Sequence, residues 1–592
     1  MGSATPVVRN TAKSILRKVG LLPAAQRIAT MLTAPPEYWE HKRRFRQLKR
    51  QHRHVLGERL NNHQCRQRIA LVCCPGFPEV EIELGLIKGL QLANFVPVVM
   101  TTTGREGRLL AQYYKLAGVD EIHPWSDFVG ETDTTVAEAV VSRCKSLQDL
   151  LEFEFGGIRV GRFAVSTALR ITYQGSLDLQ LSQDKELLVG AVAQSMAAVR
   201  AAQKILQHVR PDLAMFVDTV YSPQGELFES CVQSKIETVE WKQAHKSNAL
   251  RFKRYSLSNM GQHPWTLSEE SWRLVRDMEW TESHSKELER ELYSSYASGD
   301  WMSVVGSQFE KSMIDAARLR ERLNLDPNKK TAFIFPHILW DATLFWGKCL
   351  FGDYEKWLVE TVRAACANDR VNWVIKIHPG NQRVREGGSL QCECAETVSL
   401  NKYFGKLPPH IVMIPPESKT STYSVFQIMD YCITVCGTVG MEAARLGIPV
   451  LTGGTGPYHS KGFTVDSNTR EEYLEKVRNI EEIQPLSPAQ RELAERFAYA
   501  TFLMRSWDAK SATLRYIPNT RKFTYQGQIN IKSREDWYTA DDLRAFADWI
   551  LHPNKPGEYF SPLPQACPGV SSSRTDAEIK SHSEITSDVQ AD

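Results

Sequence analysis

The amino-acid sequence predicts an α/β fold in which two Rossmann-like domains face one cleft. Two observations predict this class. Short apolar runs that end in turn residues alternate with longer segments of helical periodicity, a pattern typical of strand–helix–strand units with a parallel sheet. This alternation occurs again in the second half of the chain, and 592 residues are too many for one hydrophobic core. We also expect a helical N-terminal arm and a disordered C-terminal tail.

The first set of units begins with an apolar strand at residues 69–74, followed by a helix at 82–90 and a second strand at 96–100. Residues 187–209 then carry apolar side chains at helical spacing and lead into a strand at 213–217. In such folds the ligand lies in the crevice at the carboxyl ends of the strands. Side chains that directly follow these strands are therefore candidates for a site.

The second set comprises a strand at 331–335, a helix at 357–365, a strand at 371–377 and, after a glycine turn and a helix, a strand at 448–451. A helical region, roughly residues 250–328, separates the two sets. We therefore expect five parts, which are a basic amphipathic helical arm (1–66), an N-terminal Rossmann-like domain with helical insertions (67–325), a C-terminal Rossmann-like domain (326–485), helices that pack back (486–560) and a disordered tail (561–592).

The two ends of the chain carry further signals. Ser487, Pro488 and Gln490 have the spacing of a capped helix start, and we expect that helix to run to about Met504. Beyond Ser561 the chain is rich in Ser, Pro, Asp and Glu, which favours disorder.

The composition excludes some classes of protein. The chain has 72 Lys and Arg against 69 Asp and Glu, so we expect no nucleic-acid partner for the molecule as a whole. The 12 cysteines are scattered through presumed strands and helices, which favours reduced thiols and a cytoplasmic protein. No secretory leader is recognisable, and no apolar stretch is long enough to predict a membrane span.

The N-terminal arm, residues 1–60, is locally basic. An amphipathic cationic segment is followed by a presumed helix with the basic residues Lys42, Arg43, Arg44, Arg46, Lys49, Arg50 and Arg53. Such an arm either lies on an anionic membrane, here the inner face of the cytoplasmic membrane, or is a solvated arm that packs on its own protein.

The first candidate site is Lys376, His378 and Pro379, at the end of the predicted strand 371–377. A cation and an imidazole donor at the carboxyl end of a buried parallel strand can neutralise a phosphate leaving group. Pro379 would fix the turn. The alternative is a strand-ending His that bonds only a loop carbonyl.

The second candidate site is Gly437, Thr438 and Glu442, in a turn between a strand and a helix. Gly437 allows close approach of a ligand to the backbone, and the Thr438 hydroxyl and the following amides can meet phosphate. Glu442, one turn into the helix, can reach ribose hydroxyls. The two sites together predict the binding of a nucleotide-sugar.

These motifs resemble those of the bacterial capsule polysaccharide biosynthesis glycosyltransferases, which have the GT-B fold and are related to Kdo transferases and bacterial sialyltransferases. The similarity covers residues 325 to 480 best and the first domain only loosely. It rests on Phe335-Pro336-His337 with Trp340-Asp341, Lys376-Ile377-His378-Pro379-Gly380, Gly437-Thr438-Val439-Gly440-Met441-Glu442-Ala443, Gly447-Ile448-Pro449-Val450, Gly454-Thr455-Gly456-Pro457-Tyr458 and Lys461-Gly462-Phe463.

The resemblance implies that the C-terminal domain binds the donor nucleotide, often that of a CMP-sugar, through His378, Pro379, Gly437, Thr438 and Glu442. The N-terminal domain is then the acceptor domain. At Cys436 the sequence departs from related transferases, which often have Ser or Thr there. Two residues after the last strand, Tyr458 and Lys461, either cover the sugar or base or anchor the loop.

Inverting transfer needs a base that deprotonates the acceptor hydroxyl. Asp218 is the first candidate because it directly follows the strand 213–217, and Glu79 and Glu81, in the loop after the first strand, are the alternatives. No Asp-x-Asp motif occurs, so we expect a metal-independent mechanism without a cofactor, in which Lys376, His378 and helix amides meet the charge of the nucleotide.

The leading hypothesis is an inverting glycosyltransferase that moves a sugar, such as a CMP-linked acidic sugar, onto a surface or capsular glycan or a lipid-linked acceptor. One alternative keeps the fold and is a polyol-phosphate transferase or a nucleotide-sugar epimerase. The other is a non-catalytic scaffold of polysaccharide biosynthesis that retains the pocket as a relic.

Overall fold

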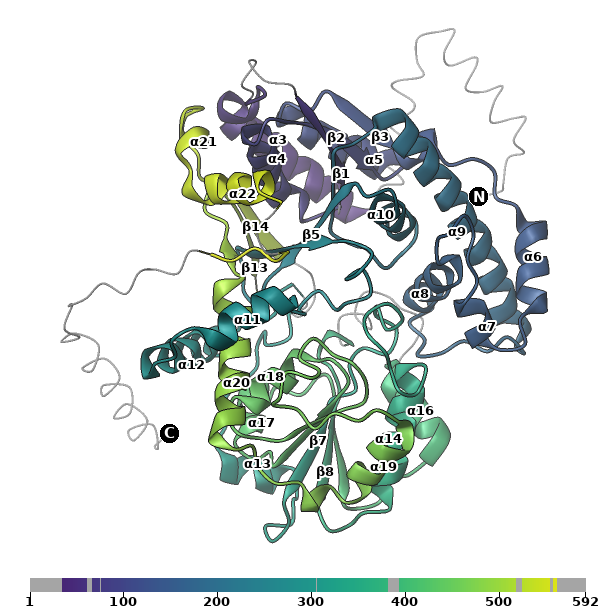
Figure 1. Cartoon of the computed structure of the whole chain (residues 1–592), viewed down its shortest axis with the longest axis vertical. Helices are drawn as coiled ribbons and strands as arrows, with labels where there is room; N and C mark the ends of the chain where they lie inside the picture. The colour runs from purple at the N-terminus through teal and green to yellow at the C-terminus, as the bar shows by residue number, and fades with distance from the viewer. Residues whose placement is uncertain are drawn as a thin grey trace, which may run out of the picture.

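A computed structural model describes residues 35–60, 67–74, 76–304, 306–381, 393–517, 524–553 and 557–561. Two sheets dominate it, one in the upper and one in the lower part of Figure 1. The amphipathic segment and the tail predicted at the two ends of the chain lie outside the described residues, apart from Ser561. None of the described helices is both long and apolar enough to cross a membrane.

The first sheet has seven strands in the order β12-β6-β5-β4-β1-β2-β3. The strands from β5 to β3 are parallel, whereas β6 and β12 are antiparallel to their neighbours. The strand bounds are β1 Arg68–Cys73, β2 Phe95–Thr101, β3 Glu121–Pro124, β4 Leu213–Phe216, β5 Glu237–Gln243, β6 Ala249–Tyr255 and β12 Trp507–Asp508.

Both faces of the first sheet are covered. Along β1, Ala70 and Val72 pack towards α4, while Leu71 and Cys73 pack towards α9 and α10. Burial on both faces explains why β1 is a continuous apolar run. The helices are α4 Val80–Leu92, α5 Gly104–Leu116, α6 Thr134–Arg143, α7 Leu147–Leu151, α8 Val160–Thr172, α9 Ser182–Val209 and α10 Gln224–Gln233, with the short η1 Trp125–Asp127.

The second sheet is wholly parallel, in the order β11-β10-β7-β8-β9. Its strands are β7 Thr331–Ile334, β8 Asn372–Lys376, β9 Ile411–Ile414, β10 Tyr431–Thr434 and β11 Val450–Thr452. The accompanying helices are α13 Ala316–Arg322, α14 Tyr354–Cys366, α16 Ala395–Phe404, α17 Thr422–Phe426, α18 Thr438–Ala444, α19 Arg470–Arg478 and the short η2 Ile480–Glu482. Together the two sheets confirm the predicted fold class, two Rossmann-like domains of GT-B type.

The chain crosses between the two sheets twice. It leaves the first sheet through α11 Glu269–Asp277 and α12 Glu282–Ala297. It returns through α20 Pro488–Tyr499, which has the predicted capping box at Ser487, and the π-helical η3 Ala500–Met504. The returning chain then forms β12, β13 Ala512–Ile517, β14 Thr524–Ile529, α21 Asp536–Thr539 and α22 Asp541–Leu551. Figure 1 shows this yellow segment beside the purple α4 and α3, Pro36–Leu56.

Side chains of the two halves share one continuous core. Residues of α8 and α9 belong to the same buried cluster as β7 and α14. Within it, the ring centroids of Phe163 and Phe345 are 4.7 Å apart. At the other end of the molecule α3, Pro36–Leu56, buries Phe45 and Leu48 against the first domain.

One prediction about the region between the domains is wrong. Residues 250–328 were expected to be helical, but β6, Ala249–Tyr255, continues the first sheet as an antiparallel hairpin with β5. The physical reason is the alternation of large apolar and charged side chains in β6, which fits a pleated strand. This hairpin turns out to form one wall of the site. The predicted domain boundaries stay a proposal.

Candidate functional site

A cavity of about 670 Å³ lies between the two sheets, where the carboxyl ends of their parallel strands meet. The first half contributes the residues that follow β1, β4 and β5, and the second half those that follow β7, β8 and β10. This is the place where α/β sheets bind ligands. Of the site residues predicted from the sequence, eight line it, namely Glu79, Asp218, Lys376, His378, Pro379, Gly437, Thr438 and Glu442.

Lys376 is the last residue of β8 and is 7% exposed. Burial, and after it the charge of Lys311, lowers the pKa of its ammonium group to about 7. Among the described residues no carboxylate pairs with this group, although buried Lys residues are almost always paired. A cation that faces a cavity without a counter-charge can attract an anionic ligand.

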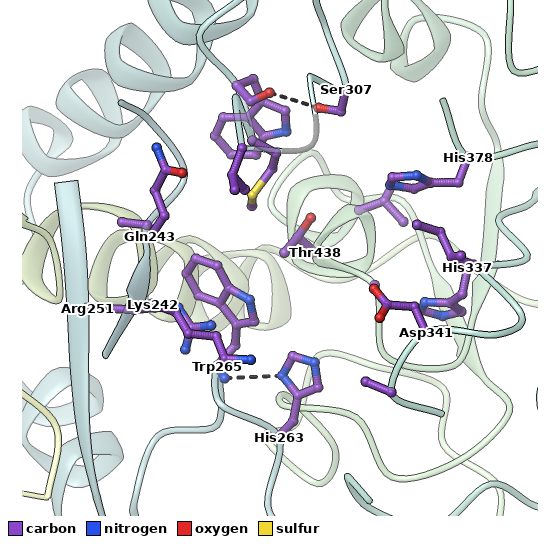
Figure 2. Close-up of a pocket in the computed structure, with 18 of the residues that line it drawn as sticks. Lys242, Gln243, Arg251, His263, Trp265, Ser307, His337, Asp341, His378 and Thr438 are labelled. Atoms are coloured by element: carbon purple, nitrogen blue, oxygen red, sulfur yellow. Dashed lines mark hydrogen bonds between the residues drawn. The ribbon is translucent and has the colours of Figure 1, made fainter. Parts of the chain in front are cut away.

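Two neutral histidines, His337 and His378, line the cavity together with Lys376, and Figure 2 shows the two histidines on the same side of it. Nδ1 of His378 accepts a hydrogen bond from the Gly380 amide at 3.0 Å, which assigns the proton to Nε2. Nε2 of His337 accepts from the amides of Val435 and Cys436, both at 3.1 Å, which assigns its proton to Nδ1. Burial lowers the pKa of His378 to about 4 and that of His337 to about 3. Each ring therefore offers one N–H donor at neutral pH.

The turn before α18 is held by internal hydrogen bonds. Gly437 is the N-cap residue, and its amide donates to the Thr434 hydroxyl at 3.3 Å. Glu442 is 2% exposed and accepts from the Tyr296 hydroxyl at 2.5 Å. Burial raises the pKa of Glu442 to about 7, against hydrogen bonds from Tyr296 and Thr438. Thr438 and Glu442 both line the cavity, and their side chains are hydrogen-bonded to each other.

The opposite wall carries the carboxylates of the first half. Asp218 follows β4, and its Oδ1 lies 4.0 Å from Nζ of Lys242. Glu79 precedes α4, and its Oε1 accepts from the Tyr516 hydroxyl at 3.1 Å. Burial raises the pKa of Glu79, and the charge of Asp218 raises it further. The cavity thus has hydrogen-bond donors that can bind a phosphate on one wall and two candidate bases on the other.

A polar bridge that was not predicted lines the cavity. Asp341, from the loop after β7, accepts from the Tyr221 hydroxyl at 2.5 Å and from Arg170 at 2.6 Å. The amide of Ala342 donates to the same hydroxyl at 2.9 Å. Tyr221 and Arg170 belong to the first half, so this bridge joins the two halves at the cavity. Asp341 had a sequence signal, since it lies in the Phe335 to Asp341 motif, but Arg170 had none.

Three predicted residues lie elsewhere. Glu81 is two residues after Glu79 in the first turn of α4, and positions two apart point in different directions. Its side chain lines another hollow, beside Arg44 and Tyr525. Tyr458 is fully buried and donates to the Gly437 carbonyl at 2.8 Å. Lys461 pairs with Glu269 at 2.9 Å. Neither Tyr458 nor Lys461 lines the cavity, and both hold loops in place.

A group of possible metal ligands exists outside this cavity. In the described part of the chain, ligand atoms of Glu121, His123 and His208 lie within 4.8 Å of one another. They belong to the edge strand β3 and the last turn of α9. None of the three lines the cavity.

No protein-family model matches the chain. No curated protein matches it either. Solved structures do match. KpsC of Thermosulfurimonas dismutans, a beta Kdo 2,4 transferase, has a TM-score of 0.29 and 13% identity over 48% of this chain and 78% of its own.

Two UDP-GlcNAc 2-epimerases also match. The Neisseria meningitidis enzyme bound to UDP-GlcNAc has a TM-score of 0.24 and 12% identity, and it covers 73% of this chain and 94% of its own. The Methanocaldococcus jannaschii enzyme in complex with UDP-GlcNAc and UDP has a TM-score of 0.28 and 13% identity over 72% and 97%.

Proposed function

We propose that this protein is an inverting glycosyltransferase that takes a sugar from a nucleotide-sugar in the cavity between its two domains. The observation that carries the proposal is Lys376, a buried cation at the carboxyl end of a parallel strand, with no carboxylate partner among the described residues. Burying an unpaired ammonium group costs several kcal/mol. A bound phosphate would offset that cost each time the donor binds.

The second wall of the cavity supports transfer over simple nucleotide binding. When the sugar leaves the donor, negative charge develops on the nucleotide phosphate, and Lys376 with the N–H donors of His378 and His337 can stabilise it. Glu79 or Asp218, across the cavity, can take the proton of the attacking hydroxyl. Attack from the side opposite the leaving phosphate inverts the sugar carbon. These residues provide the charge stabilisation and the base that such a reaction requires.

The finer assignments come from the sequence motifs. A CMP-linked acidic sugar is the proposed donor, and a surface or capsular glycan or a lipid-linked glycan is the proposed acceptor. The basic N-terminal arm would hold the enzyme on the inner face of the cytoplasmic membrane. Polyol-phosphate transfer, epimerisation of a nucleotide-sugar and a scaffold without catalysis remain the alternatives.

The experiment that tests the proposal is a thermal-shift screen of the protein against CMP, CDP, UDP, GDP and their sugars. A ligand at about 100 times its Kd adds about 2.7 kcal/mol to the free energy of unfolding. Lys376→Met should weaken the binding of that ligand about tenfold to a hundredfold, because a hydrogen bond to a charged group contributes roughly 1.5–3 kcal/mol. Lys402→Met, on the exposed face of α16, is the matched control and should change nothing.

Two outcomes would contradict the proposal. Binding without turnover that His378→Ala leaves unaltered would favour the scaffold. Release of free nucleotide without any added glycan acceptor would favour an epimerase. Transfer predicts nucleotide release that depends on the acceptor and is lost in Lys376→Met.

A further inference from the structure

A second buried cation, Arg251, faces the same cavity from the first half of the chain. It lies on β6 and is 6% exposed. Its Nε atom is buried without a hydrogen-bond partner. In the described part of the chain, no carboxylate lies within ion-pair distance of its guanidinium group, which instead stacks over the ring of Trp265 at 4.1 Å. A buried Arg without an anion is as unusual as the unpaired Lys376.

The register of the β5-β6 hairpin places a second cation directly beside it. Lys242 and Arg251 are cross-strand partners, so their side chains share one face of the sheet. Like charges in this position repel each other. Lys242 already pairs with Glu240 at 3.5 Å and with Asp218 at 4.0 Å, whereas Arg251 pairs with neither. Burial, and after it the charge of Arg505, lowers the pKa of Arg251 to about 10, while the charge of the buried Glu240 opposes this shift.

A donor and two aromatic rings complete the wall. Nδ1 of His263 accepts from the Trp265 amide at 3.1 Å, so its proton is on Nε2. The His263 ring packs edge-on against Trp346 at 5.0 Å, and Nζ of Lys242 lies 5.2 Å from the centre of the same ring. Figure 2 shows Lys242, Arg251, Trp265 and His263 together on one side of the cavity and His337 and His378 on the other. Each half of the chain therefore contributes one buried, unpaired cation to the cavity, Arg251 from the first half and Lys376 from the second.

We propose that Arg251, with Lys242 and His263, forms a second anion subsite, which binds a carboxylate or phosphate group of the acceptor. The identification of its ligand as the acceptor rests on the proposed function, because Lys376 on the opposite wall is assigned to the donor phosphate. The planar guanidinium fork suits a two-oxygen anion, and the Trp265 ring holds the fork in orientation. The subsite therefore selects acceptors with a sugar acid or a sugar phosphate over neutral glycans.

The test uses thermal unfolding of the full-length protein with three sugars as probes: glucuronate, glucose 1-phosphate and neutral glucose. Lys376→Met serves as the background, because it removes the other anion site. In this background we expect a Tm that rises with glucuronate, with glucose 1-phosphate or with both, but not with glucose. Adding Arg251→Met should abolish the rise. The sugar that is effective identifies the anion as a carboxylate or a phosphate.

A structural role for Arg251 makes the opposite prediction. If Arg251 only supports packing, Arg251→Met lowers the Tm without ligand and leaves the anion-dependent rise intact, which would overturn the subsite. The subsite predicts that Arg251→Met keeps or raises the Tm without ligand, because an unpaired buried charge is removed. Should that variant not fold, Arg251→Lys keeps the charge but loses the fork, and it should reduce the rise severalfold; an unchanged rise would overturn the proposal.

The donor screen separates the two proposals. If an anionic sugar raises the Tm through Arg251 but no nucleotide stabilises the protein, the subsite is supported and the transferase is refuted. Nucleotide binding that depends on Lys376, with no effect of either anionic sugar, would retain the transferase and refute the subsite.

Discussion

Lys376 is the residue whose titration should control donor binding. Its pKa of about 7 in the free protein means that it is charged below neutral pH and loses its proton above it. A bound phosphate favours the charged form, so affinity should be highest below about pH 7 and fall by up to tenfold per pH unit above it. Titration calorimetry with a nucleotide-sugar, whose phosphates are fully ionised, would measure this between roughly pH 6 and 9.

Lys376→Arg is the matched control for this pH dependence. The guanidinium group stays charged throughout the range, so affinity should not vary with pH in this variant. A slope that persists in Lys376→Arg would assign the titration to another group.

Glu79 is the carboxylate whose environment best suits a general base. Burial and the neighbouring Asp218 raise its pKa, so its proton is lost at higher pH than from an ordinary carboxyl group. A base acts in its deprotonated form, so activity should decline on acidification at a pH above the usual carboxyl range. Glu79→Gln should lower kcat by roughly 10²–10⁴-fold with little change in donor affinity. If Asp218→Asn causes this loss and Glu79→Gln does not, Asp218 is the base.

At the residue scale the sequence predicted those site residues that lie at the carboxyl ends of parallel strands, where α/β folds bind their ligands. Lys376 ends a parallel strand, Asp218 and His378 each lie two residues after one, and the structure places all three in one cavity. Arg251 could not be predicted in this way because it lies within an antiparallel strand. Its importance depends on the absence of a counter-charge, which only packing reveals.

At the scale of elements, α18 depends on close contact between Gly440 and Tyr458. A Cβ atom at Gly440 would lie 2.1 Å from the Tyr458 hydroxyl oxygen, which also holds the Gly437 carbonyl. Gly440→Ala should therefore displace Tyr458, lower the free energy of unfolding by about 1–3 kcal/mol and weaken nucleotide binding. Chemical denaturation and the donor screen would measure both effects.

Gly190 in α9 offers the matched control for Gly440. Apart from the neighbouring residues and the backbone of α9 itself, no heavy atom lies within 4 Å of a Cβ built there. Gly190→Ala should stabilise the protein by about 0.4–1 kcal/mol through the unfolded state and leave nucleotide binding unchanged. Equal effects of the two substitutions would refute the role assigned to the Gly440 contact.

Strands and helices were predictable where the pattern of apolar residues along the sequence is clear. The runs at 69–74 and 371–377 are apolar because β1 and β8 are buried on both faces, and their type follows from composition alone. The hairpin of β5 and β6 alternates charged and apolar residues because one face lines the cavity. The short alternating pattern of β6 was not recognised as a strand because the residues that follow it form the helices α11 and α12.

At the scale of the whole molecule, α3 presents a basic face while its apolar face is already occupied. Phe45 and Leu48 are buried, and the ring centroids of Phe45 and Tyr113 are 5.0 Å apart. The exposed side carries Arg43, Arg46, Lys49, Arg50 and Arg53. Any attachment of α3 to a membrane would therefore be electrostatic, because its apolar side chains are not free to insert.

Charge reversal at Arg46, Arg50 and Arg53 should abolish binding to anionic vesicles without disturbing the fold. Each basic side chain near such a surface contributes about 1 kcal/mol, so Arg46→Glu/Arg50→Glu/Arg53→Glu should weaken binding at least roughly a hundredfold. Co-sedimentation with phosphatidylglycerol vesicles would measure it, and added salt should weaken binding of the wild type. Deleting residues 1–60 is a poorer test, because it uncovers the core beneath Phe45.

The control for these variants has the same change of net charge at another place. Arg290, Arg318 and Arg322 are exposed on α12 and α13, and Arg290→Glu/Arg318→Glu/Arg322→Glu should bind vesicles nearly as well as the wild type. Equal losses in both triple variants would mean that net charge alone drives association. Unchanged binding in the α3 variant would exclude α3 as the attachment surface. Selective loss in the α3 variant would place the membrane at the end of the first domain that carries α3, α22 and the hairpin β13-β14.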